Sequence, residues 1–284
     1  MKIAIGSGKG GTGKTTVSLG LALSLAEESL VQYVDCDVEA PNAHLFFQDI
    51  ILNEKTAGVL VPEIDSNKCT FCGECSKFCA YHALAIFPKT ALVFHEMCHS
   101  CGGCSKICPE KAITEVKRNI GKIKTGNSNG VILSYGELNI GETQSPPLIR
   151  EVKKTIDNKI TAIIDAPPGT ACPFVETIRE SNFCVLVTEP TPFGLHDLNI
   201  AKEVVKILEI PYGVIINKFD VGDSKVEEFC LKNHIPVLMK IPNDRNIAVA
   251  YSKGIPITET VSKYKKEFIE VYKKIYERAD CNKR

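Results

Sequence analysis

Apolar residues along this chain fall into short blocks whose spacing changes from one block to the next. A continuous apolar run at 2–6 has the length of a buried strand, and the glycine-rich loop after it leads into 14–28, where apolar residues recur at helical spacing. A second apolar run follows at 31–35. This order of strand, helix and strand predicts two parallel strands joined by a right-handed crossover.

The same order continues in the second half of the chain. Runs rich in β-branched residues predict further strands at 160–165, 183–188, 212–217 and 236–241. Helical spacing predicts helices between them at 175–180, 195–208 and 225–233. The expected fold class is therefore α/β, with a doubly wound, mostly parallel sheet.

This alternation of predicted strands and helices is interrupted between residues 59 and 118, where a cysteine-rich segment contains an internal repeat. The pattern at 69–79 recurs at 98–108, with a constant offset of 29 residues. Since the α/β pattern lies on both sides, we expect an inserted small domain, placed in a loop where insertions are best tolerated. The expected organisation is the first part of the α/β domain at 1–58, the insert at 59–118 and the second part at 119–284.

An amphipathic helix is predicted near the end of the chain, at 261–275. Its apolar face is formed by Val261, Tyr264, Phe268, Val271, Tyr272 and Ile275. Such a face either closes the core of a domain or lies on a membrane surface. The polar tail at 276–284 favours the core, and no stable membrane anchor is expected.

Composition narrows the class of protein. The 284 residues include 34 basic and 34 acidic side chains, so no global field attracts nucleic acid, and no nucleic-acid partner is expected. No run approaches the roughly 18 apolar residues of a transmembrane helix, and the start of the chain leads into a glycine loop instead of a signal peptide. We therefore expect a cytoplasmic protein.

The loop after the first strand carries a phosphate-binding motif. Residues 8–15 read Gly-Lys-Gly-Gly-Thr-Gly-Lys-Thr and lie between a predicted strand and a predicted helix, which is the context that the motif requires. Backbone N–H groups of such a loop bind phosphates, Lys14 can reach the β and γ oxygens, and Thr15 can ligate Mg²⁺. The residues expected to contact the nucleotide here are Gly8, Gly10, Gly11, Thr12, Gly13, Lys14, Thr15 and Thr16.

A lysine early in this loop, Lys9, makes the motif similar to the deviant Walker A motif of the MinD/ParA and nitrogenase iron protein superfamily. The resemblance implies a P-loop ATPase, a homodimer with ATP at the interface, and contact of Lys9 with the nucleotide of the opposite subunit. The segment 35–37 resembles switch I of that family. Asp37 is then expected to orient or deprotonate the attacking water, while Asp35 either supports the loop or assists Mg²⁺.

Two later strand ends resemble other elements of the family. The segment beginning at Asp165 resembles Walker B and switch II, which implies that Asp165 holds Mg²⁺ through water and that the Gly169 N–H senses the γ-phosphate. The segment 217–220 resembles the base-contacting element, so Asn217 is expected to contact adenine, with a second contact near Pro242. The same segment also reads as a guanine signature, but the deviant Walker A motif favours ATP.

Eight of the thirteen cysteines have the spacing of metal ligands. The pattern C-x₂-C-x₂-C-x₃-C occurs twice, and this is the bacterial ferredoxin run, in which the fourth cysteine of each set ligates the other cluster. One [4Fe–4S] cluster is therefore assigned to Cys69, Cys72, Cys75 and Cys108, and the other to Cys98, Cys101, Cys104 and Cys79. Zinc and disulfides are the alternatives; the crowding of the cysteines disfavours zinc, and a reducing cytosol disfavours disulfides.

Together these patterns predict a P-loop NTPase with an inserted small α+β bacterial-type ferredoxin domain. Its expected function is to couple an ATP-driven dimer switch to electron transfer through two [4Fe–4S] clusters, with a redox or iron–sulfur protein as partner. The catalytic residues are expected to be Lys9, Lys14, Asp37 and Asp165. One alternative is an iron–sulfur cluster assembly or carrier ATPase. Cys172 of two subunits could then meet at a dimer axis, although a structural role as a small residue near switch II is favoured for Cys172. Another is a MinD-like positioning ATPase with redox-sensing clusters.

Overall fold

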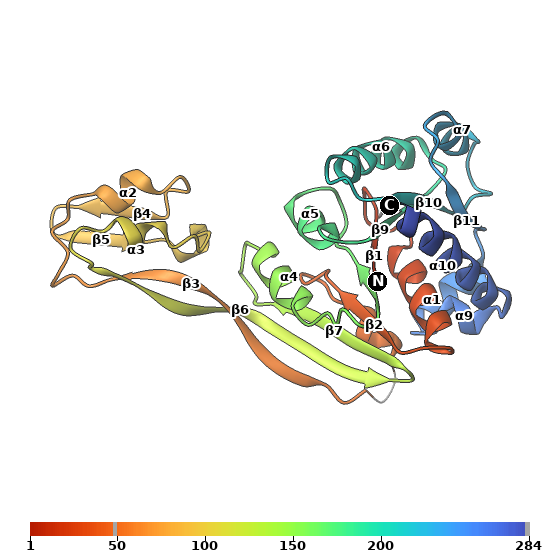
Figure 1. Cartoon of the computed structure of the whole chain (residues 1–284), viewed down its shortest axis with the longest axis horizontal. Helices are drawn as coiled ribbons and strands as arrows, with labels where there is room; N and C mark the ends of the chain where they lie inside the picture. Colours follow the sequence, from red (N-terminus) through yellow and green to blue (C-terminus); the bar gives the residue numbers. More distant parts are fainter. Residues whose placement is uncertain (48–49, 282–284) are drawn as a thin grey trace. The chain divides into compact units, whose positions relative to one another are not determined.

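The computed structural model describes residues 1–47 and 50–281 (Figure 1). Its strands are β1 Lys2–Gly6, β2 Val31–Asp35, β3 Asn53–Ile64, β4 Leu84–Phe87, β5 Thr90–Val93, β6 Ile113–Ser128, β7 Val131–Leu138, β8 Thr161–Asp165, β9 Phe183–Thr188, β10 Tyr212–Asn217 and β11 Val237–Ile241. Its α-helices are α1 Lys14–Ala26, α2 Glu74–Phe78, α3 Gly103–Ile107, α4 Pro146–Lys153, α5 Cys172–Ile178, α6 Pro192–Ile207, α7 Lys225–Lys232, α8 Arg245–Ser252, α9 Ile257–Thr260 and α10 Lys263–Cys281.

The chain forms two compact units. We call the larger one the α/β unit; it comprises Met1–Lys55, Ile123–Glu137 and Ile149–Arg284. We call the other the cysteine unit; it comprises Thr56–Lys122 and Leu138–Leu148.

The strands predicted from apolar runs are confirmed. Those at 2–6, 31–35, 183–188 and 212–217 have the predicted limits, and those at 160–165 and 236–241 begin one residue later. The predicted helices are also present, with ends that differ by a few residues. Continuous apolar runs mark these strands because a parallel sheet is covered on both faces.

The large sheet is mostly parallel, as predicted. In the described part of the chain its nine strands lie in the order β11-β10-β9-β1-β8-β2-β7-β6-β3, and each neighbouring pair from β11 to β7 is parallel. The carboxyl ends of parallel strands meet at one edge of a sheet, so the loops after β1, β2, β8 and β10 come together there. The fold therefore gathers residues that lie far apart in sequence.

Helices cover both faces of this sheet (Figure 1). Ile3 and Ile5 of β1 are buried in one core with residues of α1 and α10, whereas Ala4 is buried in a second core with residues of α5, α6 and α7. This alternation follows from the two-residue period of a strand. The sheet is thus doubly wound.

The C-terminal helix α10 belongs to the core. Tyr264, Phe268, Val271 and Ile275 are all buried in the same core as α1. The approach is close, since a Cβ at Gly20 of α1 would lie 2.3 Å from the Phe268 ring. The interpretation of this face as a core face is confirmed. No helix among the described residues is both long and apolar enough to cross a membrane.

Two long strands, β3 and β6, were not predicted. They pass through positions 59 and 118, the expected ends of the insert, whereas the cysteine unit extends from 56 to 122 and also contains 138–148. β6 is largely polar and has no continuous apolar run, whereas the short apolar run of β3, at 57–62, lies across the expected start of the insert. Asn129 and Gly130, with φ of 49° and 78°, join β6 to β7 in a two-residue turn. An Asn-Gly pair is a strong signal for a β-hairpin, but a prediction from the spacing of apolar residues does not take it into account.

The cysteine unit has a small core. β4 and β5 pair antiparallel, and α2 and α3 each carry the third cysteine of a repeat. Among the described residues, its buried cluster consists of Cys75, Leu84, Cys104 and Ile113. Two of these four side chains are cysteines, so this core depends on the chemistry of its thiols.

Candidate nucleotide site and cysteine sites

The loop between β1 and α1 is shaped for the close approach of a ligand to its backbone. Gly13 has a φ of 93° and directly precedes Lys14, the first residue of α1. A Cβ at position 13 would lie 2.3 Å from Nδ2 of Asn217, whose amide donates to the Thr12 carbonyl at 2.9 Å. Glycine is therefore required here. The free N–H groups at the start of α1 are suited to bind an anion.

Asp165 and Thr15 form a pair behind this loop. Thr15 Oγ1 donates to Asp165 Oδ2 at 2.8 Å. The other carboxylate oxygen, Asp165 Oδ1, is buried and has no hydrogen-bond partner among the described residues. A threonine hydroxyl beside an unpartnered carboxylate oxygen is an oxygen-rich environment of the kind that Mg²⁺ and its bound waters prefer. The donor set therefore fits the metal that the sequence predicted.

The charges at this end of the site are buried. Lys14 is 8% exposed, and burial lowers the pKa of its ammonium while three nearby aspartates raise it. Burial raises the pKa of Asp165 to about 6, although hydrogen bonding by Thr15 and the charge of Lys14 act in the opposite direction. A bound divalent cation would favour the ionised form of this carboxylate.

A buried hydroxyl network supports Asp165, and sequence reasoning missed it. Tyr33 OH donates to Asp165 Oδ2 at 3.0 Å and lies 2.7 Å from Ser18 Oγ. Tyr33 belongs to β2 and Ser18 to α1. A tyrosine inside a buried strand signals that its hydroxyl needs a partner, but local sequence does not say which one.

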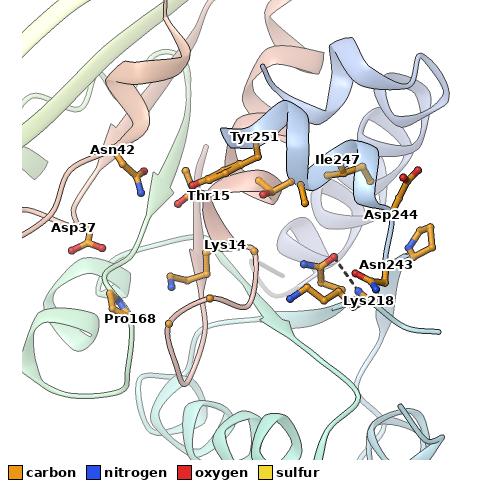
Figure 2. A pocket seen from close by; sticks show the side chains of 17 residues that line it. Lys14, Thr15, Asp37, Asn42, Pro168, Lys218, Asn243, Asp244, Ile247 and Tyr251 are labelled. Carbon is orange, nitrogen blue, oxygen red and sulfur yellow. Dashed lines mark hydrogen bonds between the residues drawn. The ribbon is translucent and has the colours of Figure 1, made fainter. Parts of the chain in front are cut away.

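Asp35 and Asp37 differ in what they contact. The carboxylate of Asp35, which is buried, accepts backbone N–H groups from Asp37, Asn42 and Ala43 at 2.9, 3.2 and 3.2 Å. These bonds shape the loop after β2 and favour the supporting role for Asp35. Asp37 instead lines the pocket on the side of Lys14 (Figure 2). Burial raises the pKa of Asp37, and the charge of Lys14 lowers it.

The other end of the pocket is built from the ends of β10 and β11 and from α8 (Figure 2). Asp220 Oδ1 accepts the N–H of Asn243 at 2.7 Å, which fixes the loop before α8. The residues lining this end include Asn217, Lys218, Pro242, Asn243, Asp244, Ile247 and Tyr251. The whole pocket has a volume of about 380 Å³, within the range of small-molecule sites.

Most of the predicted nucleotide contacts line this pocket. They are Gly10, Gly11, Gly13, Lys14, Thr15, Thr16, Asp37, Asn217 and Pro242. The lining does not include Gly8, Lys9, Thr12, Asp165 or Gly169; next to Gly169, Pro168 lines it instead. Sequence reasoning missed Asn42 and the contribution of α8. The N-cap at Asp244, which accepts the Asn246 N–H at 2.8 Å, is the local signal for that helix.

Lys9 is held within its own chain. Its ammonium lies 3.6 Å from Glu189 Oε2, and the ammonium of Lys218 lies 2.6 Å from Glu189 Oε1. Glu189 follows β9 and is largely buried, with 13% of its side chain exposed. One carboxylate therefore links the phosphate loop to the base end of the site, a connection that no local pattern suggests.

The eight cysteines of the repeat line two cavities, and each cavity takes one cysteine from the other repeat. Cys69, Cys72, Cys75 and Cys108 line one cavity, which we call the first cysteine site. Cys79, Cys98, Cys101 and Cys104 line the other, which we call the second cysteine site. The ferredoxin run led us to expect the same two groups. That each group holds a cluster stays a prediction.

Backbone N–H groups contact sulfur atoms in both sites. Ala83 N and Ala112 N lie 3.4 and 3.3 Å from the sulfurs of Cys79 and Cys108, the fourth cysteines of the two repeats. Such donors favour the thiolate, which is the form that ligates iron. Within the described residues, no three His, Cys, Asp or Glu side chains form a group that could hold a metal ion. The fit to a cluster rests on four thiols around one cavity and on these N–H groups.

Taken with its sheet, the glycine loop, the buried lysine at the start of α1 and the carboxylate behind the adjacent threonine define the chain as a P-loop nucleotide-binding protein. The chain belongs to the CobQ/CobB/MinD/ParA nucleotide binding domain family, which matches residues 3–257. This confirms the MinD/ParA part of the resemblance that Lys9 suggested.

Individual relatives add detail. A protein of Methanocaldococcus jannaschii, described as uncharacterized, is 32% identical over 282 residues, which cover 98% of this chain and 97% of that protein. An iron-sulfur cluster carrier protein of Pyrococcus horikoshii is 25% identical over 281 residues, covering 90% of this chain and 78% of that protein. The septum site-determining protein MinD of Pyrococcus horikoshii, complexed with Mg-ADP, has the same fold, with a TM-score of 0.60 at 21% identity over 96% of this chain and 95% of that one.

Proposed function

We propose that this chain is a MgATP-dependent iron–sulfur protein, in which an ATP-driven dimer switch is coupled to one-electron transfer through two [4Fe–4S] clusters. The observation that carries the iron–sulfur part is the exchange of the fourth cysteine between the two repeats, with Cys108 at the first site and Cys79 at the second. Two mononuclear zinc sites would not require that exchange. It is the arrangement of a two-cluster bacterial ferredoxin.

The nucleotide half of the proposal rests on the buried charges of the α/β unit. Lys14 neutralises the β and γ phosphates, Thr15 holds Mg²⁺, and Asp165 holds a water of that ion. Asp37 orients the water that attacks the γ-phosphate and accepts its proton. The products are ADP and phosphate, so we propose an ATPase.

The dimer in this proposal is closed by Lys9. In the single chain, Lys9 is paired with Glu189. In the dimer it exchanges this carboxylate for the phosphates of the partner's nucleotide, which carry more negative charge. Contacts to the γ-phosphate are lost on hydrolysis, which gives the two states that a nucleotide switch needs.

The clusters supply one-electron chemistry when bound. The chain's own residues hold them through eight thiolates and set their environment through backbone N–H donors at Cys79, Cys98 and Cys108. The electron donor and acceptor are then redox or iron–sulfur proteins that dock on the cysteine unit.

An anaerobic redox titration followed by EPR tests this proposal, with and without MgATP, on the wild type and on Lys9→Ala. The proposal expects about eight iron atoms per chain, a nucleotide-dependent change of potential or spectrum, and loss of that change in Lys9→Ala. Unchanged spectra with MgATP in the wild type would contradict the coupling. A protein that binds no iron and sulfide would contradict the iron–sulfur part.

A second candidate function is delivery of a cluster to another protein. Two observations favour it: the Pyrococcus relatives are called iron-sulfur cluster carrier proteins, and Cys172 is an exposed thiol at the start of α5. Incubation of the loaded protein with an apo-acceptor separates the two functions. Retention of iron favours electron transfer, whereas transfer that is lost in Cys172→Ser favours delivery.

A further inference from the structure

Residues 42–47, which we call the β2 loop, pack against α8 and against the turn that follows α8. The rings of Phe46 and Tyr251 lie 4.9 Å apart between centroids, with their planes at 50°. Phe46 is 8% exposed, so this contact is buried. The backbone also approaches closely, since Gly254 has a φ of 70° and a Cβ there would lie 2.7 Å from the Leu45 carbonyl oxygen. The β2 loop is therefore held by the segment that forms one end of the nucleotide pocket.

The β2 loop is tied to Asp37 through one carboxylate. Asp35 Oδ2 accepts the N–H groups of Asn42 and Ala43, each at 3.2 Å. The other oxygen, Asp35 Oδ1, accepts the N–H of Asp37 at 2.9 Å. Asp35 is buried, so these hydrogen bonds fix the start of the β2 loop relative to the backbone of Asp37. A displacement of the loop therefore also displaces Asp37.

Tyr251 lies between the β2 loop and the interior of the pocket. The described lining of the pocket includes Tyr251 but not Phe46. Although Tyr251 comes from α8, its side chain points toward Thr15 (Figure 2). Burial raises the pKa of Tyr251, and a hydrogen bond with Thr15 acts in the opposite direction. A nucleotide in the pocket can thus contact this tyrosine on one side while Phe46 packs on the other.

Two further ring contacts hold the β2 loop on sides that do not face the pocket. His44 stacks on Tyr135 of β7, with ring centroids 5.2 Å apart and planes at 14°. Phe47 lies 6.1 Å from Tyr33 of β2. The described lining of the pocket includes neither of these tyrosines. Of the three ring contacts made by the described residues of the loop, the one to α8 is the one that reaches the pocket.

We propose that Tyr251 is a positioning residue for ATP hydrolysis, whose ring holds Phe46 and thereby keeps the β2 loop and Asp37 in place. A group that orients the attacking water must lie within hydrogen-bond reach of it, so a small displacement of Asp37 slows the reaction. A bound nucleotide restricts the Tyr251 ring from the pocket side, and binding therefore orders the β2 loop. Tyr251 itself transfers no proton. The inference rests on the proposed function, since it assigns the attacking water to Asp37.

Steady-state kinetics of MgATP hydrolysis by the whole chain, loaded with iron and sulfide, test this inference. Phe46→Leu keeps an apolar side chain in the core but removes the ring contact. Its kcat should fall by roughly tenfold, the upper end of what an aromatic pair contributes. Its KM should stay near that of the wild type, because Phe46 is not among the described lining residues.

Variants of Tyr251 show whether the effect passes through this contact. Tyr251→Ala should lower kcat by a similar factor, and the double variant with Phe46→Leu should lose little more, because both changes break the same contact. Tyr251→Phe keeps the ring and should restore most of the kcat that Tyr251→Ala loses. Val249→Ala, at a residue of α8 that is 43% exposed, is the matched control and should behave as the wild type does.

Hydrogen exchange follows the β2 loop without any catalysis. The N–H groups of Leu45 and Phe47 donate to carbonyls within the loop at 3.1 and 3.2 Å, so their exchange reports how well the loop is ordered. A non-hydrolysable MgATP analogue should slow exchange at 42–47 in the wild type and in Tyr251→Phe, but not in Tyr251→Ala.

Several results would overturn the inference while leaving the proposed function intact. They are an unchanged kcat in Phe46→Leu, additive losses in the double variant, or nucleotide-dependent protection that persists in Tyr251→Ala. A loss in Tyr251→Phe as large as in Tyr251→Ala would overturn it as well, because the effect would then belong to the hydroxyl group and Thr15. A wild type that binds MgATP without hydrolysing it would instead contradict the proposed function, and hydrogen exchange would still decide whether nucleotide orders the loop through Tyr251.

Discussion

The two functional regions of this protein are built in different ways. The nucleotide pocket draws its residues from strands and loops spread over most of the chain, and it sits on a large core that does not depend on a ligand. The cysteine sites draw theirs from residues 69–108, and their core contains the thiols themselves. The first region should be formed before its ligand binds, whereas the second should depend on what its thiols hold.

The largest expected effect tests this difference directly. Without iron and sulfide, amide hydrogen exchange in residues 69–108 should become at least about 100-fold faster, because two of the four side chains in the buried cluster of the cysteine unit are thiols that then hold no ligand. Strands β1, β8 and β9 should stay protected, and nucleotide affinity should change little. Hydrogen exchange with mass spectrometry on apo and loaded protein makes the measurement. Equal protection of 69–108 in both forms would show that the comparison is wrong.

A change in the nucleotide pocket should leave the iron content of the cysteine unit unchanged. Lys14→Ala removes the buried ammonium at the start of α1, and MgATP affinity should fall by about 100-fold or more, since charge-assisted hydrogen bonds in a buried site contribute roughly 3 kcal/mol. Calorimetry measures the affinity, and iron analysis should give the same content as in the wild type. Lys253→Ala, at an exposed lysine after α8, is the matched control and should bind as the wild type does.

The pH dependence of Mg²⁺-nucleotide binding sharpens the role of Asp165. As the pH falls through about 6, affinity should weaken, approaching about tenfold per pH unit, because a protonated carboxyl cannot hold a Mg²⁺-bound water. Tyr33→Phe removes a hydrogen bond that favours the ionised form, so the midpoint should move to higher pH. Titration calorimetry at several pH values checks both. A flat profile between pH 5 and 7 would exclude Asp165 from the Mg²⁺ site.

The raised pKa of Asp165 gives the stability of the ligand-free chain the opposite pH dependence from nucleotide affinity: stability should fall, not rise, as the pH increases. The folded state binds the proton of Asp165 more tightly than the unfolded chain does, because the pKa of this carboxyl is near 3.8 in the unfolded chain. The contribution of this group to the free energy of unfolding should therefore decrease as the pH rises from about 4 to about 6. Denaturant titrations of the wild type and of Asp165→Asn should differ in this window, and Mg²⁺ with nucleotide should offset the difference.

The smallest expected effect concerns Glu189. Glu189→Gln releases Lys9 and Lys218 from a shared carboxylate. Nucleotide-dependent dimerisation should then become up to about fivefold tighter, because a partly exposed ion pair contributes roughly 1 kcal/mol and Lys9 no longer has to break one. Sedimentation with MgATP measures this. Glu270→Gln, which breaks an exposed pair on α10, is the control. Weaker dimerisation in Glu189→Gln would show that this carboxylate supports the closed form instead of competing with it.

Sequence alone determined those features whose signal is local. The strands of the α/β unit are continuous apolar runs, the phosphate loop is one short motif, and the two cysteine repeats follow fixed spacings. Each of these is encoded within about ten residues. The strand β6 was missed because its largely polar residues carry no such run, and β3 because its short apolar run, at 57–62, lies across the expected start of the insert.

The tertiary structure decided which distant side chains meet. Tyr33 and Asp165 lie 132 positions apart, and Asn217 donates to the Thr12 carbonyl across 205 positions. The strand order places them together at one edge of the sheet, and local periodicity does not encode strand order. Arg118 and Glu142 are only 24 positions apart, yet their pairing depends on how 139–145 folds against the turn before Cys98. The spacing of the cysteines shows where ligands are, whereas the charges that surround them depend on contacts that only the folded chain makes.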